Sequence, residues 1–187
     1  FSKPRPLGVT NEEKYSNILY SLKDFSFLKD KKVVIFGGGD SALDWAREIS
    51  AISSSVSLVH RRTEFRGNPD TIKGCQVSLY LPYVPHSLIE KDGACLGVEI
   101  EEVNTHEIIS LDADNILVNY GSIPAPSLFD LTTSSEGFGA TVNEVNQAKE
   151  RIYVVGDAAF VNNKAKRIAP GQKDVERVIS SILANCR

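Results

Sequence analysis

The chain has 187 residues, of which 42% are hydrophobic and 24% charged, a composition typical of one globular domain or two small ones. Its formal net charge of −3 provides no basic field for nucleic acid, and no apolar run is long enough for a membrane span, so we expect neither partner. The separated cysteines Cys75, Cys95 and Cys186 fit a reducing compartment, and no secretory leader is evident, so we expect a cytoplasmic protein. The chain has no methionine and begins with Phe1, so we also expect a fragment of a longer protein.

The first half of the chain alternates between apolar runs and turn signals. Residues 1–9 are proline-rich and predict a linker, and 11–24 predict short helical turns. The β-branched run 33–36 ends in three glycines, which is typical of a strand buried on both faces. Apolar residues at helical spacing predict a helix over 40–52, and 56–59 predict a second buried strand.

The pattern changes in the second half. A brief helix is predicted from Asn68, and period-two alternation then predicts strands at 76–81, 94–103 and 107–111. Because tight turns follow them, we expect these strands to be antiparallel. The remaining predicted elements are two buried strands and a final helix, at 115–119, 151–155 and 174–184.

The order of strand, glycine turn, helix and strand makes a βαβ unit, whose crossover is right-handed in nearly all proteins. The predicted fold class is therefore α/β, a Rossmann-like βαβ parallel sheet with helices on both faces and a small antiparallel β insertion.

The glycine-rich turn after the first buried strand fits the dinucleotide-binding pattern G-x-G-x-x-G/A over residues 37–42. In this pattern Gly37 permits the tight turn, Gly39 lets a pyrophosphate approach the backbone, and Ala42 lets the helix pack closely on the sheet. Asp40 and Ser41 begin a helix whose free amides would face the phosphates. A simple packing turn is the alternative, but the strand and helix on either side favour dinucleotide binding.

The next strand ends in a basic cluster where NAD enzymes place a carboxylate, about 20 residues after the fingerprint, for the ribose 2′-hydroxyl. Arg61, Arg62 and Arg66 offer paired donors to a phosphate, and Glu64 comes too late to occupy the strand tip. An exposed basic turn is the alternative, but the position after the fingerprint favours NADPH over NADH. His60 is either a further phosphate contact or a structural residue.

Four segments carry a family resemblance: GGGDSALDWA at 37–46, HRRTEFR at 60–66, NYG at 119–121 and YVVGD at 153–157. Together they resemble the NADPH domain of thioredoxin-reductase-like flavoproteins, most of all the ferredoxin/flavodoxin–NADP reductases. The resemblance implies transfer of hydride from NADPH to FAD and then of electrons to ferredoxin or flavodoxin. The cofactors carry that chemistry, so no catalytic side chain is expected.

The resemblance also implies the site residues. Asn119, Tyr120 and Gly121 would lie on the nicotinamide side, and Asp157 after Gly156 would bind the ribityl chain of FAD. The full set of expected cofactor-binding residues is Gly37, Gly38, Gly39, Asp40, Ser41, His60, Arg61, Arg62, Arg66, Asn119, Tyr120, Gly121, Gly156 and Asp157. No metal site is expected, because His86 and His106 have no partners at ligand spacing.

The implied organisation is a linker from a missing FAD domain at 1–27, an NADPH domain at 28–147, and the last strand and helix of the mostly absent FAD domain at 148–187. Such a fragment would be inactive by itself, and a homodimer is possible in this family. No Cys-x-x-Cys pair occurs, which excludes a dithiol relay in this chain. After Gly171 the family has a second glycine and small residues that contact FAD, whereas this chain has Gln172, Lys173 and Asp174. Two alternatives stay open: a related flavoprotein with another acceptor, and a non-catalytic NADP-binding sensor.

Overall fold

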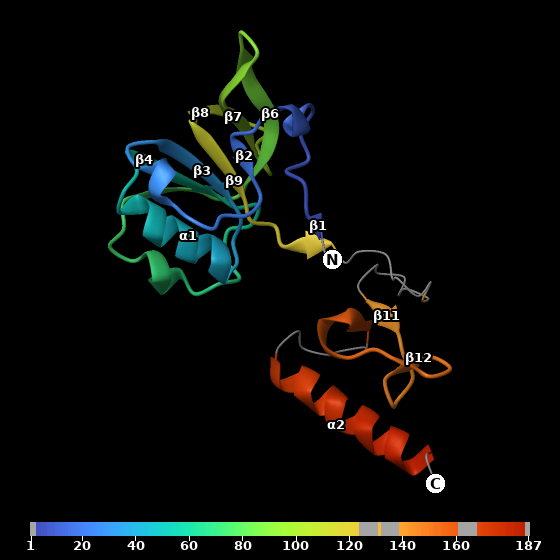
Figure 1. The fold of residues 1–187 in the computed structure, drawn as a ribbon. Coiled ribbons are helices and arrows are strands. Elements are labelled where there is room, and N and C mark those ends of the chain that lie inside the picture. The colour runs from blue at the N-terminus through green and yellow to red at the C-terminus, as the bar shows by residue number, and fades with distance from the viewer. Residues whose placement is uncertain (1–2, 124–130, 132–138, 161–167, 186–187) are drawn as a thin grey trace. The chain divides into compact units, whose positions relative to one another are not determined.

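The computed structural model describes residues 3–123, 131, 139–160 and 168–185, and the chain separates into two compact units (Figure 1). Residues 4–121 form one unit, and the described residues from 122 onward belong to the other, together with Lys3. Among the described residues, no helix has both the length and the apolar character needed to cross a bilayer.

A five-stranded parallel sheet is the centre of the unit 4–121, in the order β2-β9-β3-β4-β5. The central strand β3 is almost fully buried from Val33 to Phe36, as expected for a parallel strand covered on both faces. Helix α1 joins β3 to β4, so the predicted α/β class and its βαβ unit are confirmed. The bounds are β2 Ile18–Leu19, β3 Lys32–Phe36, α1 Asp40–Ser50, β4 Ser55–Val59, β5 Val77–Tyr80 and β9 Asn115–Val118.

The two faces of this sheet are covered differently. On one face α1 buries Leu43, Ala46 and Ile49 against side chains of β3 and β4. On the other face lies a three-stranded antiparallel sheet, β6-β7-β8, which contributes Val98 and Ile100 to the second core cluster. The expectation of helices on both faces is therefore wrong for the described part of this unit. Alternating apolar residues on a β-sheet give the same kind of flat apolar face that a helix would supply.

The antiparallel sheet consists of β6 (Tyr83–Lys91), β7 (Ala94–Glu102) and β8 (Ile108–Asp112). Strands β7 and β8 confirm two of the predicted antiparallel strands. The third, predicted at 76–81, is β5, which pairs parallel to β4. Alternation arises wherever one face is exposed, as at the edge residue Leu79, and it does not distinguish parallel from antiparallel pairing. Besides β8, β7 pairs with β6, a strand absent from the sequence prediction.

The shorter elements of this unit lie around the sheet. The prediction of helical turns over 11–24 is only partly right, because the segment holds the 3₁₀ turn η1 (Glu12–Lys14) and then the edge strand β2. A further turn, η2, spans Ser26–Leu28. The brief helix predicted from Asn68 is η3 (Pro69–Ile72), and the Asn68 side chain caps it by accepting from the Asp70 amide at 3.0 Å.

The second unit contains short strands and one long helix, α2 (Ile168–Asn185), which begins earlier than the predicted 174–184. The predicted strand 151–155 is the two-residue β13 (Ile152–Tyr153), which is antiparallel to β12 (Gln147–Lys149). Strands β11 (Ala140–Thr141) and β14 (Ala159–Phe160) pair in parallel, and the 3₁₀ turn η4 spans Gly156–Ala158. Strands β1 (Lys3–Pro4) and β10 (Ser122–Ile123) make a separate two-stranded sheet.

Candidate functional site

Three of the four motif segments begin at one edge of the parallel sheet, where β3, β4 and β9 end. The register aligns Phe36 with Val59 on one side and with Val118 on the other, so the residues that follow these three positions meet at that edge. The amide of Gly37 donates to Val59 O at 3.0 Å, and the amide of Asn119 donates to Phe36 O at 2.8 Å. In parallel α/β sheets, ligands bind outside the carboxyl ends of the strands, which is where these segments lie.

The glycine turn after β3 is tightly enclosed. A Cβ atom at Gly37 would lie 2.8 Å from the Cβ of Ala42 and 2.9 Å from the carbonyl oxygen of Asn119. At Gly38 the added Cβ would collide with the ring of His60. The turn therefore needs glycine for close packing, and its backbone has side chains from both neighbouring segments against it.

The amino end of α1 follows the turn directly. Gly39 occupies the N-cap position and provides no side-chain cap, and Asp40 and Ser41 are exposed in the first turn. One oxygen of Asp40 accepts a hydrogen bond from the Asn68 amide at 3.2 Å. An uncapped helix start with a positive dipole is suited to an anionic group.

The arginine-bearing loop is bonded to the glycine turn by its backbone. The amides of Arg66 and Gly67 both donate to the carbonyl oxygen of Gly38, at 2.7 and 3.0 Å. Gly67 is buried, and a Cβ there would lie 2.6 Å from the amide nitrogen of Asp40. The sequence prediction missed Gly67. The available signal was its position, directly after the arginine cluster and before Asn68.

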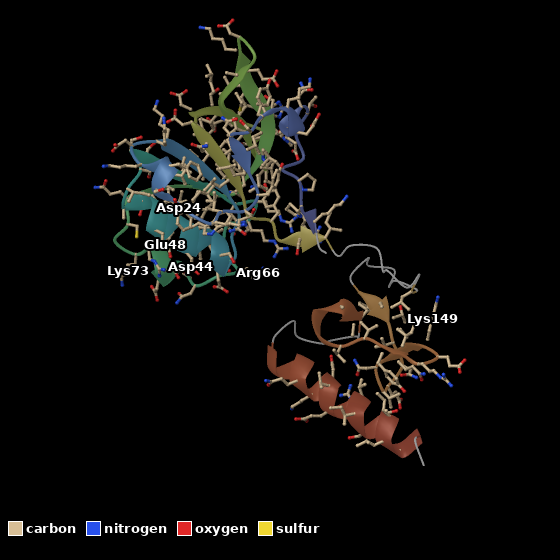
Figure 2. All side chains as sticks on the ribbon, in the orientation of Figure 1. Asp24, Asp44, Glu48, Arg66, Lys73 and Lys149 are labelled. Carbon is tan, nitrogen blue, oxygen red and sulfur yellow. The ribbon has the colours of Figure 1, made fainter. Side chains whose placement is uncertain are left out.

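The guanidinium groups of Arg61, Arg62 and Arg66 are on exposed residues. A Cβ at Gly39 would lie 3.2 Å from Nη2 of Arg66, so this guanidinium lies over the glycine turn, and Figure 2 shows the Arg66 side chain beside α1. Within the described part of the chain, none of the three forms an ion pair with a carboxylate. Three unpaired cations next to an uncapped helix start make a strongly anion-attracting surface.

Two buried polar atoms flank the glycine turn without partners. They are Nε2 of His60, at the end of β4, and Nδ2 of Asn119, at the end of β9. Among the described residues, Ser53 Oγ is the one other buried side-chain polar atom with no hydrogen bond. Since buried polar groups are nearly always satisfied, their grouping here indicates a place where a ligand supplies partners.

The ring of His60 is held in place and lacks an acidic partner. It stacks on Phe65, with ring centroids 5.7 Å apart and the planes 25° from parallel. Burial lowers the pKa of His60, a backbone hydrogen bond with Glu64 opposes this effect, and the nearby charges of Arg61, Arg62 and Arg66 lower the pKa further. Burial and the arginine charges thus favour the uncharged imidazole.

Tyr120 and Gly121 continue the site beyond β9. The Tyr120 ring meets Phe36 edge to face at 6.4 Å, and burial raises the pKa of its hydroxyl group. Gly121 adopts a positive φ of 77°, and its carbonyl oxygen accepts from the Arg5 amide at 2.9 Å. These contacts fix the direction in which the chain leaves the sheet.

The two remaining predicted site residues, Gly156 and Asp157, belong to the second unit. Gly156 has a φ of 68°, and its amide donates to Oδ2 of Asp174 at 3.1 Å. Asp174 is 3% exposed, and the neighbouring Arg177 donates to Oδ1 of the buried Asn146 at 2.9 Å. The side chain of Asp157 lies outside the described residues. Sequence patterns gave no sign that Asp174 is buried, because it falls among polar residues of α2.

Comparison with known proteins identifies the family. Residues 2–181 match the family described as pyridine nucleotide-disulphide oxidoreductase. The chain belongs to this family. Within the described residues, no group of three or more His, Cys, Asp or Glu side chains is placed to hold a metal ion.

Similar members of this family are ferredoxin–NADP reductases. One from Acholeplasma laidlawii is 36% identical over 184 residues, covering 95% of this chain and 56% of that protein. One from Streptococcus thermophilus is 33% identical over 187 residues, covering 96% of this chain and 56% of that protein. The chain thus spans just over half the length of these relatives.

Solved structures of two reductases have the same fold as this chain. Thioredoxin reductase from T. acidophilum superposes with a TM-score of 0.84 at 20% identity, over 99% of this chain and 63% of that one. A bacillithiol disulfide reductase from Staphylococcus aureus gives 0.81 at 19% identity, over 98% and 59% of the two chains. The Rossmann-like architecture predicted from the sequence is confirmed by these similarities.

Proposed function

We propose that this chain is the NADPH-binding part of an FAD-dependent ferredoxin/flavodoxin–NADP reductase. The observation that carries the proposal is the pair of hydrogen bonds from the Arg66 and Gly67 amides to Gly38 O, which joins the basic loop to the glycine turn. A pyrophosphate cradle and a cluster of guanidinium groups then form one site. The chain's membership of the pyridine nucleotide-disulphide oxidoreductase family and its similarity to ferredoxin–NADP reductases support the same function.

The residues present fit NADPH. The pyrophosphate would lie against the glycine turn and the first amides of α1, at Gly37–Ser41. The 2′-phosphate would be bound by Arg61, Arg62 and Arg66, whose guanidinium groups are free of carboxylates among the described residues. Asn119, with its unpartnered buried Nδ2, would face the nicotinamide half together with Tyr120 and Gly121.

The residues of the second unit are compatible with FAD in the full-length protein. The amide of Gly156 donates to the buried carboxylate of Asp174, and Asp157 follows in the position that the family resemblance assigns to flavin binding. When bound, a flavin supplies the conversion of a hydride into single electrons. The role of this chain would be to hold NADPH in register with it, and we propose no acid or base residue.

We propose ferredoxin or flavodoxin as the acceptor in the cytoplasm, and a homodimer as the assembly. A related flavoprotein with another acceptor would use the same nucleotide site, because the absence of any Cys-x-x-Cys pair excludes only a dithiol acceptor in this chain. A non-catalytic NADP sensor would lack flavin altogether. Full-length protein that purifies with FAD would contradict the sensor.

The nucleotide specificity is tested by calorimetric titration with NADPH and NADH. The variant Arg61→Ala/Arg62→Ala should lose roughly 1.5–3 kcal/mol of NADPH binding for each charge-assisted hydrogen bond removed, with little change for NADH. Lys29→Ala/Lys31→Ala removes the same charge from exposed residues before β3 and is the matched control. Equal binding of NADPH and NADH by the wild-type chain and by the full-length protein would contradict the proposal.

A further inference from the structure

The ring of His60 lies between the glycine turn and the basic loop. One side of the ring is so close to Gly38 that any side chain there would collide with its Nδ1, Cε1 and Cγ atoms. The ring also stacks on Phe65. The backbone of His60 is also fixed, because its amide donates to Tyr80 O at 3.1 Å and its carbonyl accepts from the Tyr83 amide at 3.0 Å. The ring is therefore a rigid support beneath the turn.

The charges around His60 distinguish it from the other two histidines. His86 and His106 each place Nδ1 against an oxygen of Glu101, a carboxylate that can stabilise a charged ring. His60 has no such ion pair among the described residues, and the charged side chains that influence it are Arg61, Arg62 and Arg66, with Glu64 acting only through its backbone. A positive imidazole would be repelled by these guanidinium groups. Its partly buried position would also disfavour the charge, because burial removes water from it.

We propose that His60 is a positioning residue, whose uncharged ring supports the Gly38 turn and so holds the loop that presents Arg66, and that it is not a cationic ligand of the 2′-phosphate. Gly38 provides the mechanical link, because it lies against the ring and accepts hydrogen bonds from the Arg66 and Gly67 amides through its carbonyl oxygen. The proposal rests on the proposed NADPH site. Loss of this support should weaken both nucleotides through the turn and NADPH further through Arg66, while direct contact with the 2′-phosphate stays with the arginines.

The first test compares His60→Ala with His60→Phe, which restores an uncharged ring, and with His106→Ala as a control whose side chain is 74% exposed. In calorimetric titrations, His60→Ala should weaken both nucleotides by at least about fivefold, and NADPH more than NADH. His60→Phe, which restores the ring but not Nε2, should recover part of that loss, and His106→Ala should bind like the wild type. If both substitutions weaken NADPH and leave NADH unchanged, His60 is a phosphate ligand and the proposal is wrong.

The second test does not need a nucleotide. Amide hydrogen exchange at Arg66 and Gly67 reports the two bonds to Gly38 O, and it should be slow in the wild type and in His60→Phe but clearly faster in His60→Ala. Unchanged exchange in folded His60→Ala would overturn the support role. If the alanine variant does not fold, slow exchange at both amides in His60→Phe supports the proposal, and fast exchange there overturns it.

The charge state is read by NMR of the labelled imidazole rings, with the His60 signal assigned by its loss in His60→Phe. The chemical shift of the His60 ring should stay at the value of a neutral imidazole at pH 7, both in the free chain and with saturating NADPH. A shift to the charged position in the complex would overturn the proposal. Should the wild-type chain and the full-length protein bind neither nucleotide, the proposed function fails, while the free-chain exchange and NMR results still decide the role of His60.

Discussion

The backbone amide of Arg66 donates a 2.7 Å hydrogen bond to the carbonyl oxygen of Gly38. This bond joins two loops that follow different strands of the parallel sheet, and the Gly67 amide reinforces it at 3.0 Å. Because backbone groups form the link, removing a guanidinium group from the basic loop leaves the link in place. Substitutions that disturb the turn and substitutions that only remove a guanidinium group should therefore behave differently.

Gly38→Ala should disturb the turn itself. The new methyl group collides with the ring of His60, which is also stacked on Phe65. We expect a loss of roughly 1–3 kcal/mol in the free energy of unfolding, measured by urea denaturation, together with weaker binding of NADPH and NADH. Gly39→Ala is the control for the stability measurement only, since its methyl group would meet the end of the flexible Arg66 side chain at 3.2 Å. Equal stability of Gly38→Ala and wild type would contradict the packing argument.

Arg66→Ala should leave the turn intact and remove one cation. Its amide bond to Gly38 remains, and its exposed guanidinium group has no ion pair among the described residues, so stability should stay within about 0.5 kcal/mol of wild type. NADPH affinity should fall, by titration, while NADH affinity does not. Arg47→Ala removes an exposed arginine of α1 that contacts Asp44 and Glu48, and it should not affect either nucleotide.

The antiparallel sheet should respond to acid through Glu101. Hydrogen bonds from His106 and then His86 lower the pKa of this carboxyl group in the folded chain. A group whose pKa is lowered by folding contributes stability above its unfolded value, about 4.3, and that contribution is lost as the pH falls through the folded value. Wild type should therefore lose stability over this acid range, and Glu101→Gln should lose less. Urea denaturation from pH 3 to 7 measures this, with Glu107→Gln as the control; parallel curves for wild type and Glu101→Gln would contradict it.

Asp174→Ala should weaken the second unit. The carboxylate is buried, accepts from the Gly156 amide, and lies 3.8 Å from the Arg177 guanidinium group. Its loss should cost about 1–3 kcal/mol in local stability, seen as faster amide exchange at Gly156. Glu176→Ala, an exposed substitution on the same helix, should leave that exchange rate unchanged. The amides of Arg66 and Gly67 in the other unit provide an internal reference in the same spectra.

The sequence alone determined the features that depend on local pattern. The run before Gly37 and the helical spacing after Asp40 predicted β3 and α1, because burial on one or both faces imposes a periodicity on neighbouring residues. The glycine fingerprint and the arginine cluster were likewise legible, since both chemistries need particular residue types at short spacing. The family resemblance followed from these segments and is confirmed by the match over residues 2–181.

Only the tertiary structure decided which segments pair. Alternating residues show that a strand has one apolar face, but they do not name its neighbour, so β5 was assigned to the wrong kind of pairing and β6 was missed. The bonds from Arg66 and Gly67 to Gly38 O involve backbone groups that every residue carries, and no residue type announces them. The uncharged state of His60 depends on burial and on cations brought together by the fold, and so it too is a property of the assembled sheet edge.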